Sequence, residues 1–257
     1  GNDSVTLEQI RQIPGVSGVI TALHDIPAGE AWTYEDVMER KQEVEASGLG
    51  LIGIESINVH EDIKIGLPTR DELIDNYNKS LEAVGKAGIH LVCYNFMPVF
   101  DWTRTDLAMP LPDGSTALAY DSSIIDGIDA SEMFERIEKA SGGFVMPGWE
   151  PNRRDEIMDL FDKYKDVTAD KLRENYKVFL DGIMPTCEKY EIKMAVHPDD
   201  PAWDVFGLPR IVTCEDDMLK IAALNNSIYN GFTFCTGSLG SNLNNDLPNI
   251  IRNPKIA

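Results

Sequence analysis

Short apolar runs alternate with amphipathic stretches along most of the chain. The runs are nearly continuous in apolar residues, lead into polar ones and cover residues 16–23, 51–57, 89–96, 193–196 and 231–238. Such runs are typical of strands buried on both faces of a sheet. The amphipathic stretches place apolar residues three and four positions apart and cover residues 33–47, 69–87, 169–190 and 215–226. The alternation predicts parallel strands joined by crossover helices, which is the pattern of an α/β fold.

Two of the helical stretches carry clear local signals. Thr33 is predicted to be an N-cap, with Asp36 at the spacing of a capping box, and Ser47-Gly48 follows the last apolar position of that helix. The stretch 169–190 is strongly amphipathic, and its apolar positions are Leu172, Tyr176, Phe179, Leu180 and Ile183. Both stretches are therefore predicted to be helices.

Polar residues collect after every predicted strand. An open doubly wound sheet gathers its polar site at one switch point, whereas a barrel draws on the ends of many strands. The sequence contains neither G-x-G-x-x-G after a strand nor G-x-x-x-x-G-K-[ST], so nothing in it supports a nucleotide-binding fold. We therefore expect an α/β fold of the TIM (β/α)8-barrel type.

The number of strands differs from that of a complete barrel. Five core strands are predicted, whereas a TIM barrel has eight. A five-stranded remnant would expose unpaired strand edges and half of its interior. We therefore expect the barrel to be C-terminally incomplete in this chain, because the sequence stops short of the natural C-terminus.

The alternation is interrupted after the third strand, from 107 to 168. A turn signal at 111–115 can head a small hairpin, and residues 129–140 and 153–164 are predicted to be helical. This segment has too little apolar periodicity for a core of its own. We therefore expect one barrel domain over 1–257, with 107–168 as a helical and irregular insertion over the barrel mouth.

The charge and the cysteines narrow the function classes. The formal charge is −20, which opposes binding to nucleic acids and to anionic membranes. No apolar run approaches the roughly 18 residues of a membrane span, and no signal peptide is visible at the N-terminus. None of the four cysteines forms a C-x-x-C pair, so free thiols in a reducing compartment, the cytoplasm, are expected.

Two consecutive predicted strands end in side chains able to bind a metal ion. His197 follows the 193–196 strand, and Cys235 lies 38 residues later in the 231–238 run. Each residue also has a purely structural interpretation, His197 as a satisfied strand-end histidine and Cys235 as a core residue. One His and one Cys are two ligands short of a four-coordinate ion. A thiolate beside an imidazole suits zinc, iron or manganese better than calcium or magnesium.

Long motifs at the strand ends resemble those of the mannonate dehydratases of the UxuA type. The motifs are TALHDIP at 21–27, ESI at 55–57, HEDIK at 60–64, CYNFMPV at 93–99, DWTRTD at 101–106, AVHPDDP at 195–201 and CTGS at 235–238. The resemblance covers nearly the whole chain. It implies a xylose-isomerase-like barrel that dehydrates D-mannonate to 2-keto-3-deoxy-D-gluconate in hexuronate breakdown.

The resemblance also implies a divalent metal, Mn²⁺ or Fe²⁺, with His197 and Cys235 among its ligands. It places two further ligands and the acid and base of the reaction beyond Ala257, so the catalytic residues are not identified in this chain. Asp199 and Asp200 are expected to fix the loop or to support the ligands. Such an ion would stabilise the negative charge of the reaction and create a local positive site in a chain of charge −20.

Five other residues are candidates for binding the sugar acid. His24 and His60 follow predicted strands and are expected to contact hydroxyls or the carboxylate, although both could simply cap loops. Asn95 is a candidate hydroxyl ligand or a turn residue. Arg104 could bind the carboxylate or pair structurally with Asp101. Glu55 could also be a buried carboxylate that supports the site.

Two rival functions remain open from the sequence. A sugar isomerase or epimerase of the same barrel class would also place a divalent ion among strand-end ligands. An inactive, truncated sugar-acid-binding remnant is the other alternative. The expected partner is a small-molecule sugar acid, without nucleic acid or membrane, and a homo-oligomer is expected because a barrel with a large insertion offers surface for association.

Overall fold

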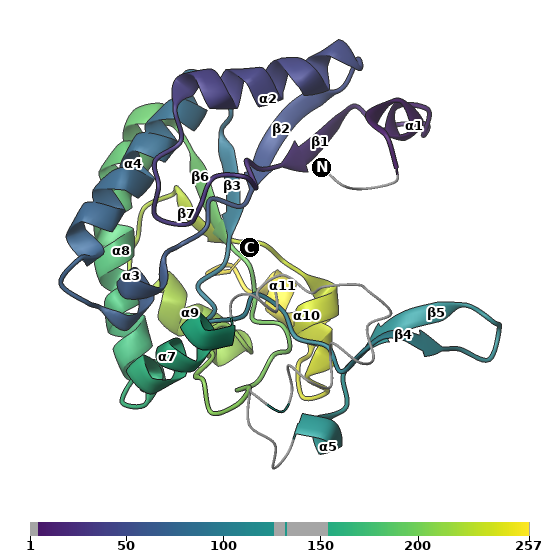
Figure 1. Ribbon diagram of the computed structural model, residues 1–257, viewed down its shortest axis with the longest axis vertical. Coiled ribbons are helices and arrows are strands. Elements are labelled where there is room, and N and C mark those ends of the chain that lie inside the picture. The colour runs from purple at the N-terminus through teal and green to yellow at the C-terminus, as the bar shows by residue number, and fades with distance from the viewer. Residues whose placement is uncertain (1–4, 126–131, 133–153, 257) are drawn as a thin grey trace. The chain divides into compact units, whose positions relative to one another are not determined.

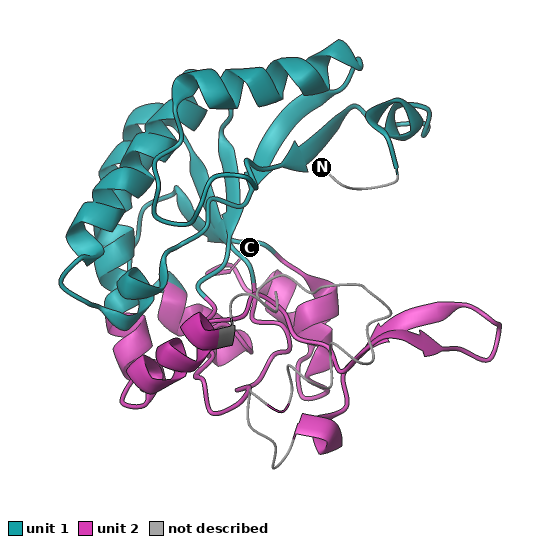
Figure 2. Cartoon of the chain, in the orientation of Figure 1, with its two compact units in different colours: residues 1–96, 175–197, 222–233 teal, residues 97–174, 198–221, 234–257 magenta. Residues whose placement is uncertain are grey.

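The computed structural model describes residues 5–125, 132 and 154–256. The chain divides into two compact units, coloured separately in Figure 2. Unit 1 consists of residues 1–96, 175–197 and 222–233, and unit 2 consists of residues 97–174, 198–221 and 234–257. None of the described helices is both long and apolar enough to cross a lipid bilayer.

Unit 1 is built on a parallel sheet, and within the described residues this sheet has five strands (Figure 1). Their order is β1-β2-β3-β6-β7, and each neighbouring pair is parallel. The strands are β1 (Gly18–Thr21), β2 (Gly50–Glu55), β3 (Leu91–Tyr94), β6 (Lys193–Val196) and β7 (Asn230–Phe232). All five correspond to predicted runs, so the α/β fold with a parallel sheet is confirmed.

Helices flank this sheet along one side, as Figure 1 shows for α2, α4 and α8. The described helices that lie wholly or mainly in unit 1 are α1 (Leu7–Arg11), α2 (Tyr34–Ala46), α3 (Glu61–Ile65), α4 (Arg70–Lys86) and α8 (Ala169–Tyr190). Thr33 caps α2 and forms the predicted capping box with Asp36. The Asn78 side chain of α4 donates a hydrogen bond to the Gly182 carbonyl of α8, which ties these two helices together.

An aromatic cluster fills the space between the sheet and the helices of unit 1. Tyr77 of α4, Tyr94 of β3, and Tyr176 and Phe179 of α8 are all buried. The Phe179 ring meets the Tyr77 ring edge to face, with centroids 5.0 Å apart. The predicted apolar positions of α8 are fully buried. Burial of each such side chain contributes roughly 1.5–3 kcal/mol, so this cluster is the main core of the unit.

One expectation about the sheet is wrong at its β1 edge. Strands buried on both faces were expected, but Ile20 of β1 and Ile52 of β2 are 42% and 56% exposed. Their neighbours Leu51 and Ile54 are buried. Ile52 and Ile54 share one face of β2, and only Ile54 is buried, so an apolar run alone does not reveal which positions along a face are open.

Unit 2 carries the hairpin predicted around the 111–115 turn. Strands β4 (Asp106–Pro110) and β5 (Thr116–Ala119) pair in antiparallel fashion, and the Leu111 N–H donates to the Ser115 carbonyl across the turn. The hairpin is the long two-stranded arm in Figure 1. The described helices that lie wholly or mainly in this unit are α5 (Ser122–Ile125), α7 (Arg154–Tyr164), α9 (Glu215–Ala222), α10 (Thr236–Ser241) and α11 (Leu247–Arg252).

The predicted insertion is only partly covered by the structure. The helix expected over 153–164 is present as α7. The helix expected over 129–140 lies outside the described residues, apart from residue 132. A single domain and the placement of 107–168 over a barrel mouth stay predictions.

Candidate functional site

Four candidates lie at the C-terminal ends of the unit 1 strands. Asn95 and His197 directly follow β3 and β6, whose last residues, Tyr94 and Val196, are register partners. The His197 N–H donates a 2.7 Å hydrogen bond to the Tyr94 carbonyl, which continues this pairing past the strand end. Both side chains are half-buried. The parallel register therefore places the imidazole and the amide on neighbouring chain segments at one edge of the sheet.

Two further candidates at this edge are more open to solvent. His24 lies in the turn after β1 and is exposed. Glu55 is the last residue of β2 and is also exposed, so the interpretation of Glu55 as a buried supporting carboxylate is wrong. Glu55 shares its face of β2 with the buried Leu51, so its exposure belongs to its place at the end of the strand and not to an open face.

His60 has a defined structural role in addition to its candidate role in binding. It is the N-cap of α3, and its Nδ1 accepts a 3.1 Å hydrogen bond from the Asp62 N–H. A nitrogen that accepts this bond carries no proton, so in the neutral imidazole Nε2 is the donor. His60 therefore does cap a chain segment, which was the structural alternative to a role in binding. Its Nε2–H group remains available to donate a hydrogen bond to a ligand.

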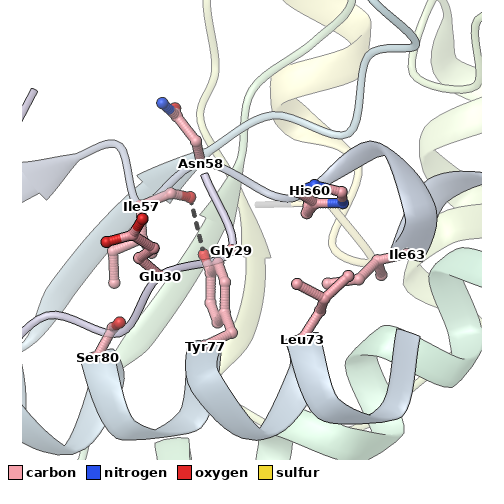
Figure 3. Close-up of a pocket in the computed structure, with 9 residues that line it drawn as sticks. All are labelled: Gly29, Glu30, Ile57, Asn58, His60, Ile63, Leu73, Tyr77 and Ser80. Atoms are coloured by element: carbon pink, nitrogen blue, oxygen red, sulfur yellow. Dashed lines mark hydrogen bonds between the residues drawn. The ribbon is translucent and has the colours of Figure 1, made fainter. Parts of the chain in front are cut away.

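A small recess lies beside His60 in unit 1, between the β2 end and α4 (Figure 3). The Tyr77 hydroxyl donates to the Ile57 carbonyl on its wall, and the Asn58 side chain points away from it. The recess has a volume of about 10 Å³. Such a volume holds about one water molecule, so this recess cannot itself bind a six-carbon acid.

In unit 2, Arg104 is held by an acidic residue of the AVHPDDP motif. Arg104 Nη1 lies 2.7 Å from Asp200 Oδ1, and Nη2 lies 3.0 Å from Oδ2. Nη1 also donates to the Thr103 carbonyl at 2.9 Å. The guanidinium lies over the Trp102 ring, 5.5 Å from its centroid. Arg104 therefore has Asp200 as its bidentate partner, and the sequence alone had offered Asp101 for a structural pair.

The same carboxylate is connected to Cys235 through Ser238. Ser238 Oγ lies 3.1 Å from Asp200 Oδ2 and 3.3 Å from Cys235 Sγ. A serine hydroxyl carries one hydrogen, and the charged carboxylate is the stronger of the two acceptors. Ser238 Oγ is thus the donor in both contacts, with Asp200 the preferred acceptor and Cys235 Sγ the alternative one. Arg104, Asp200, Ser238 and Cys235 thus form one hydrogen-bonded chain, which joins two predicted site residues.

Cys235 does not lie in a strand, contrary to the 231–238 prediction. β7 ends at Phe232, and Cys235 is the N-cap of α10. Its Sγ accepts a 3.5 Å hydrogen bond from the Ser238 N–H. The thiol is half-buried and free, whereas Cys93 and Cys187 are buried as expected. The thiol direction is therefore set by the first turn of α10.

Asp199 fixes the loop after His197, as expected. Its Oδ2 accepts hydrogen bonds from the Ile211 and Val212 N–H groups at 2.8 and 2.7 Å. Arg210 lies 3.7 Å from its other oxygen, and both side chains are buried. Burial raises the pKa of Asp199 above the ordinary carboxylate range, although Arg210 and the two N–H groups oppose this shift.

The donor atoms have suitable chemistry for a metal ion, but they do not form a complete site. Imidazole and thiol groups are ligands for manganese, iron and zinc. Within residues 5–125, 132 and 154–256, no three His, Cys, Asp or Glu side chains gather as a group able to hold a metal. The described residues therefore do not supply a full coordination sphere.

The partners of two participants were not predicted. Asp200 was expected to fix the loop or to support the ligands, without a named partner, and Ser238 appeared only as part of CTGS. The sequence signal that could have pointed to these two residues was their position in the motifs that contain His197 and Cys235. Hydrogen-bond partners that lie 96 and 38 residues apart cannot be read from local periodicity.

The parallel α/β sheet with polar strand ends in unit 1 defines the class of fold, and unit 2 contributes the Arg-Asp-Ser-Cys chain. Comparison with known proteins identifies the family. Residues 1–255 match the family described as D-mannonate dehydratase (UxuA). The chain therefore belongs to the D-mannonate dehydratase family, a family of carbon–oxygen lyases, and the resemblance seen in the sequence is confirmed.

Curated relatives and a solved structure agree with this assignment. The chain is 62% identical over 253 residues to the mannonate dehydratase of Brachyspira hyodysenteriae, covering 98% of this chain and 71% of that protein. It is 53% identical over 251 residues to that of Thermotoga maritima, covering 98% and 70%. The crystal structure of mannonate dehydratase from Streptococcus suis serotype 2 matches with a TM-score of 0.86 at 44% identity, covering 97% of this chain and 65% of that one.

Proposed function

We propose that this chain catalyses the dehydration of D-mannonate to 2-keto-3-deoxy-D-gluconate. The observation that carries the proposal is the 62% identity over 98% of the chain to a curated mannonate dehydratase. The geometry of unit 2 supports it, because Arg104 is a fixed cation of the kind that recognises a carboxylate.

The reaction removes the proton on the carbon next to the carboxylate and expels the hydroxyl group of the following carbon. The electron pair of the C–H bond forms the new double bond while the C–O bond breaks, and the hydroxide takes up a proton and leaves as water. The enol then gives up the proton of its hydroxyl group and takes up a proton on the neighbouring carbon, which yields the 2-keto acid. Negative charge grows on the carboxylate oxygens first, so a cation beside them lowers the barrier.

We assign the recognition of the sugar acid to five residues. Arg104 binds the carboxylate, and the polar side chains at the β1, β2 and β3 ends bind hydroxyls: His24, Glu55, His60 and Asn95. His60 offers Nε2–H, because Nδ1 is engaged by the Asp62 N–H. A sugar acid has several hydroxyls, so a group of exposed and half-buried donors and acceptors suits it better than an apolar pocket.

We further propose that His197 and Cys235 are ligands of a divalent ion, Mn²⁺ or Fe²⁺. When bound, such an ion stabilises the charge on the carboxylate oxygens. His197 must be unprotonated and Cys235 ionised to serve as ligands, so we expect metal affinity to fall at low pH. We also propose that the fold is of the barrel type, that the protein is a cytoplasmic homo-oligomer, and that its four free cysteines stay reduced there.

The direct test is incubation of the purified chain with D-mannonate and Mn²⁺, followed by mass spectrometry of the product. A product lighter by one water supports the dehydratase. A product of unchanged mass supports the rival isomerase or epimerase. Binding of D-mannonate without any product supports the inactive sugar-acid-binding alternative.

The metal assignment has a separate test in the metal content of purified variants. We expect His197→Ala and Cys235→Ala each to lose bound Mn²⁺. His90→Ala and Cys214→Ala are matched controls, because His90 lies at the other end of β3 and Cys214 precedes α9. Full metal content in either site variant, or equal loss in the controls, contradicts the assignment.

A further inference from the structure

The contacts of Arg104 leave one defined edge of its guanidinium for a ligand. Asp200 takes the edge formed by Nη1 and Nη2, and Thr103 takes the second hydrogen of Nη1. A guanidinium has a second bidentate edge, formed by Nε–H and the other hydrogen of Nη2. Among the described residues, no hydrogen bond uses that edge. A carboxylate from solution fits it with two parallel hydrogen bonds.

The orientation of the guanidinium is set from several sides. The backbone at Trp102 pairs in parallel with that at Asp200, and the Thr103 N–H donates to the Asp200 carbonyl at 3.2 Å. The Trp102 ring covers one face of the guanidinium. The side chains of Arg104 and Asp200 are 20% and 15% exposed, so the pair is partly desolvated and more rigid than a surface ion pair.

Asp200 is itself held by the segment that carries Cys235. Ser238 is 2% exposed, and its hydroxyl reaches Asp200 Oδ2, the oxygen that also accepts from Arg104 Nη2. The carboxylate therefore has a bonding partner on the α10 side and another on the Arg104 side. A shift of Asp200 would move the open edge of Arg104.

We propose that Asp200 is a positioning residue that aims the open edge of Arg104 at the substrate carboxylate, with Ser238 holding Asp200 in place. This inference rests on the proposed function, because the carboxylate is that of the sugar acid. Asp200 also neutralises much of the Arg104 charge, so it contributes orientation rather than affinity. The pair therefore favours a carboxylate that meets the guanidinium in one plane.

The consequence is a separation of kcat from KM. In Asp200→Asn the guanidinium keeps its charge, and D-mannonate still binds it, but in several poses. We expect kcat to fall about 10- to 100-fold while KM stays within about threefold. In an Arg104→Lys background, Asp200→Asn should add little, because the residue it positions is already gone.

A second measurement needs neither substrate nor turnover. Phenylglyoxal modifies a guanidinium through its two Nη atoms, which Asp200 covers in Arg104. Asp200→Asn should raise the rate of Arg104 modification at least about threefold, followed by peptide mass spectrometry. Asp217→Asn is the matched control in unit 2, because it removes a similarly exposed partner of a different arginine, Arg173, at 2.7 Å. Asp217→Asn should leave both the rate of Arg104 modification by phenylglyoxal and kcat unchanged.

Ser238→Ala keeps the inference testable if Asp200→Asn folds poorly. Ser238→Ala removes only the hydroxyl that holds Asp200 Oδ2. It should raise the rate of Arg104 modification and lower kcat, each by about threefold.

An unchanged rate of Arg104 modification in both Asp200→Asn and Ser238→Ala overturns the inference. A raised modification rate with unchanged kcat overturns it as well. A wild-type chain without turnover overturns the proposed function and the carboxylate assignment, while the modification rates still decide whether Asp200 holds Arg104.

Discussion

The hydroxyl oxygens of Tyr94 and Tyr176 lie 2.5 Å apart, and both side chains are buried in unit 1. The two hydroxyls form a hydrogen bond with each other at a buried position, where neither can form one with solvent water. Burial raises the pKa of both phenols, so both stay protonated at neutral pH. The pair connects β3 to α8, and it gives both of these buried hydroxyls a hydrogen-bond partner in an otherwise aromatic core.

The first prediction concerns this pair. We expect Tyr94→Phe or Tyr176→Phe to lower the free energy of unfolding by about 1–3 kcal/mol, because each leaves one buried hydroxyl without its partner. The double variant should lose less than the sum of the two, since no unpaired hydroxyl remains. Urea unfolding measures all three. Strict additivity would show that the two hydroxyls do not act as a pair, and exposed Tyr34→Phe is the control.

The second prediction concerns the end of α3. Gly66 has φ of +86°, and a Cβ there would lie 2.6 Å from Asn175 Oδ1. Asn175 is buried and donates from Nδ2 to the Lys64 carbonyl at 2.8 Å. Gly66→Ala should therefore destabilise the chain by more than about 1 kcal/mol, through both backbone strain and displacement of Asn175. Gly114→Ala is the control, with similar φ but open space around it. If thermal melts show an equal loss of stability in Gly66→Ala and Gly114→Ala, backbone strain alone accounts for the effect and the contact with Asn175 does not contribute.

The third prediction concerns the capping box of α2. Thr33 Oγ1 accepts from the Asp36 N–H at 3.1 Å, and Asp36 Oδ2 accepts from the Thr33 N–H at 3.2 Å. Thr33→Ala should cost about 0.5–2 kcal/mol in urea unfolding, and Thr33→Ser should restore most of it. A serine variant as unstable as the alanine variant would contradict the role of the hydroxyl.

The fourth prediction concerns pH. Burial raises the pKa of the Cys187 thiol to about 12, above the roughly 8.5 of an unfolded thiol. The folded chain thus holds this proton more tightly. The associated stability is fully present below about pH 8.5 and is lost as the pH rises towards 12, at about 1.4 kcal/mol per pH unit.

Two measurements follow from this shift. Iodoacetamide at pH 8 should leave Cys187 unmodified in the folded chain and modify it in urea. Cys187→Ala should lose less stability between pH 7 and pH 10 than the wild type, although it is less stable at pH 7 because of the cavity it leaves. An equal pH dependence in the two proteins would contradict the assignment.

Much of the fold follows from local pattern, because burial on a sheet or helix leaves a regular period. The α8 face and the Thr33 cap were both predicted for this reason. α3 was missed because its N-cap is a histidine, which is not among the usual capping residues. The Cys235 run was predicted too long because the switch from β7 to α10 depends on one bond from the Ser238 N–H to the thiol.

The sequence predicted which residues could belong to the candidate site, but not the hydrogen bonds and the ion pair that connect them. His197, Cys235 and Arg104 stand out because polar groups follow apolar runs. The link from Arg104 through Asp200 and Ser238 to Cys235 depends on three separate chain segments meeting in unit 2. Periodicity describes each segment alone, so it contains no information about such meetings.

The exposed isoleucines of β1 and β2 have a consequence for how the protein behaves in concentrated solution. Ile20 and Ile52 are exposed apolar side chains on a chain of charge −20. At low ionic strength, mutual repulsion keeps copies of the chain apart before these side chains can touch another copy. In about 1 M salt, repulsion extends only about 3 Å, and contact between exposed apolar side chains is no longer prevented. Salt should therefore govern the colloidal stability of this protein more strongly than it governs its folding.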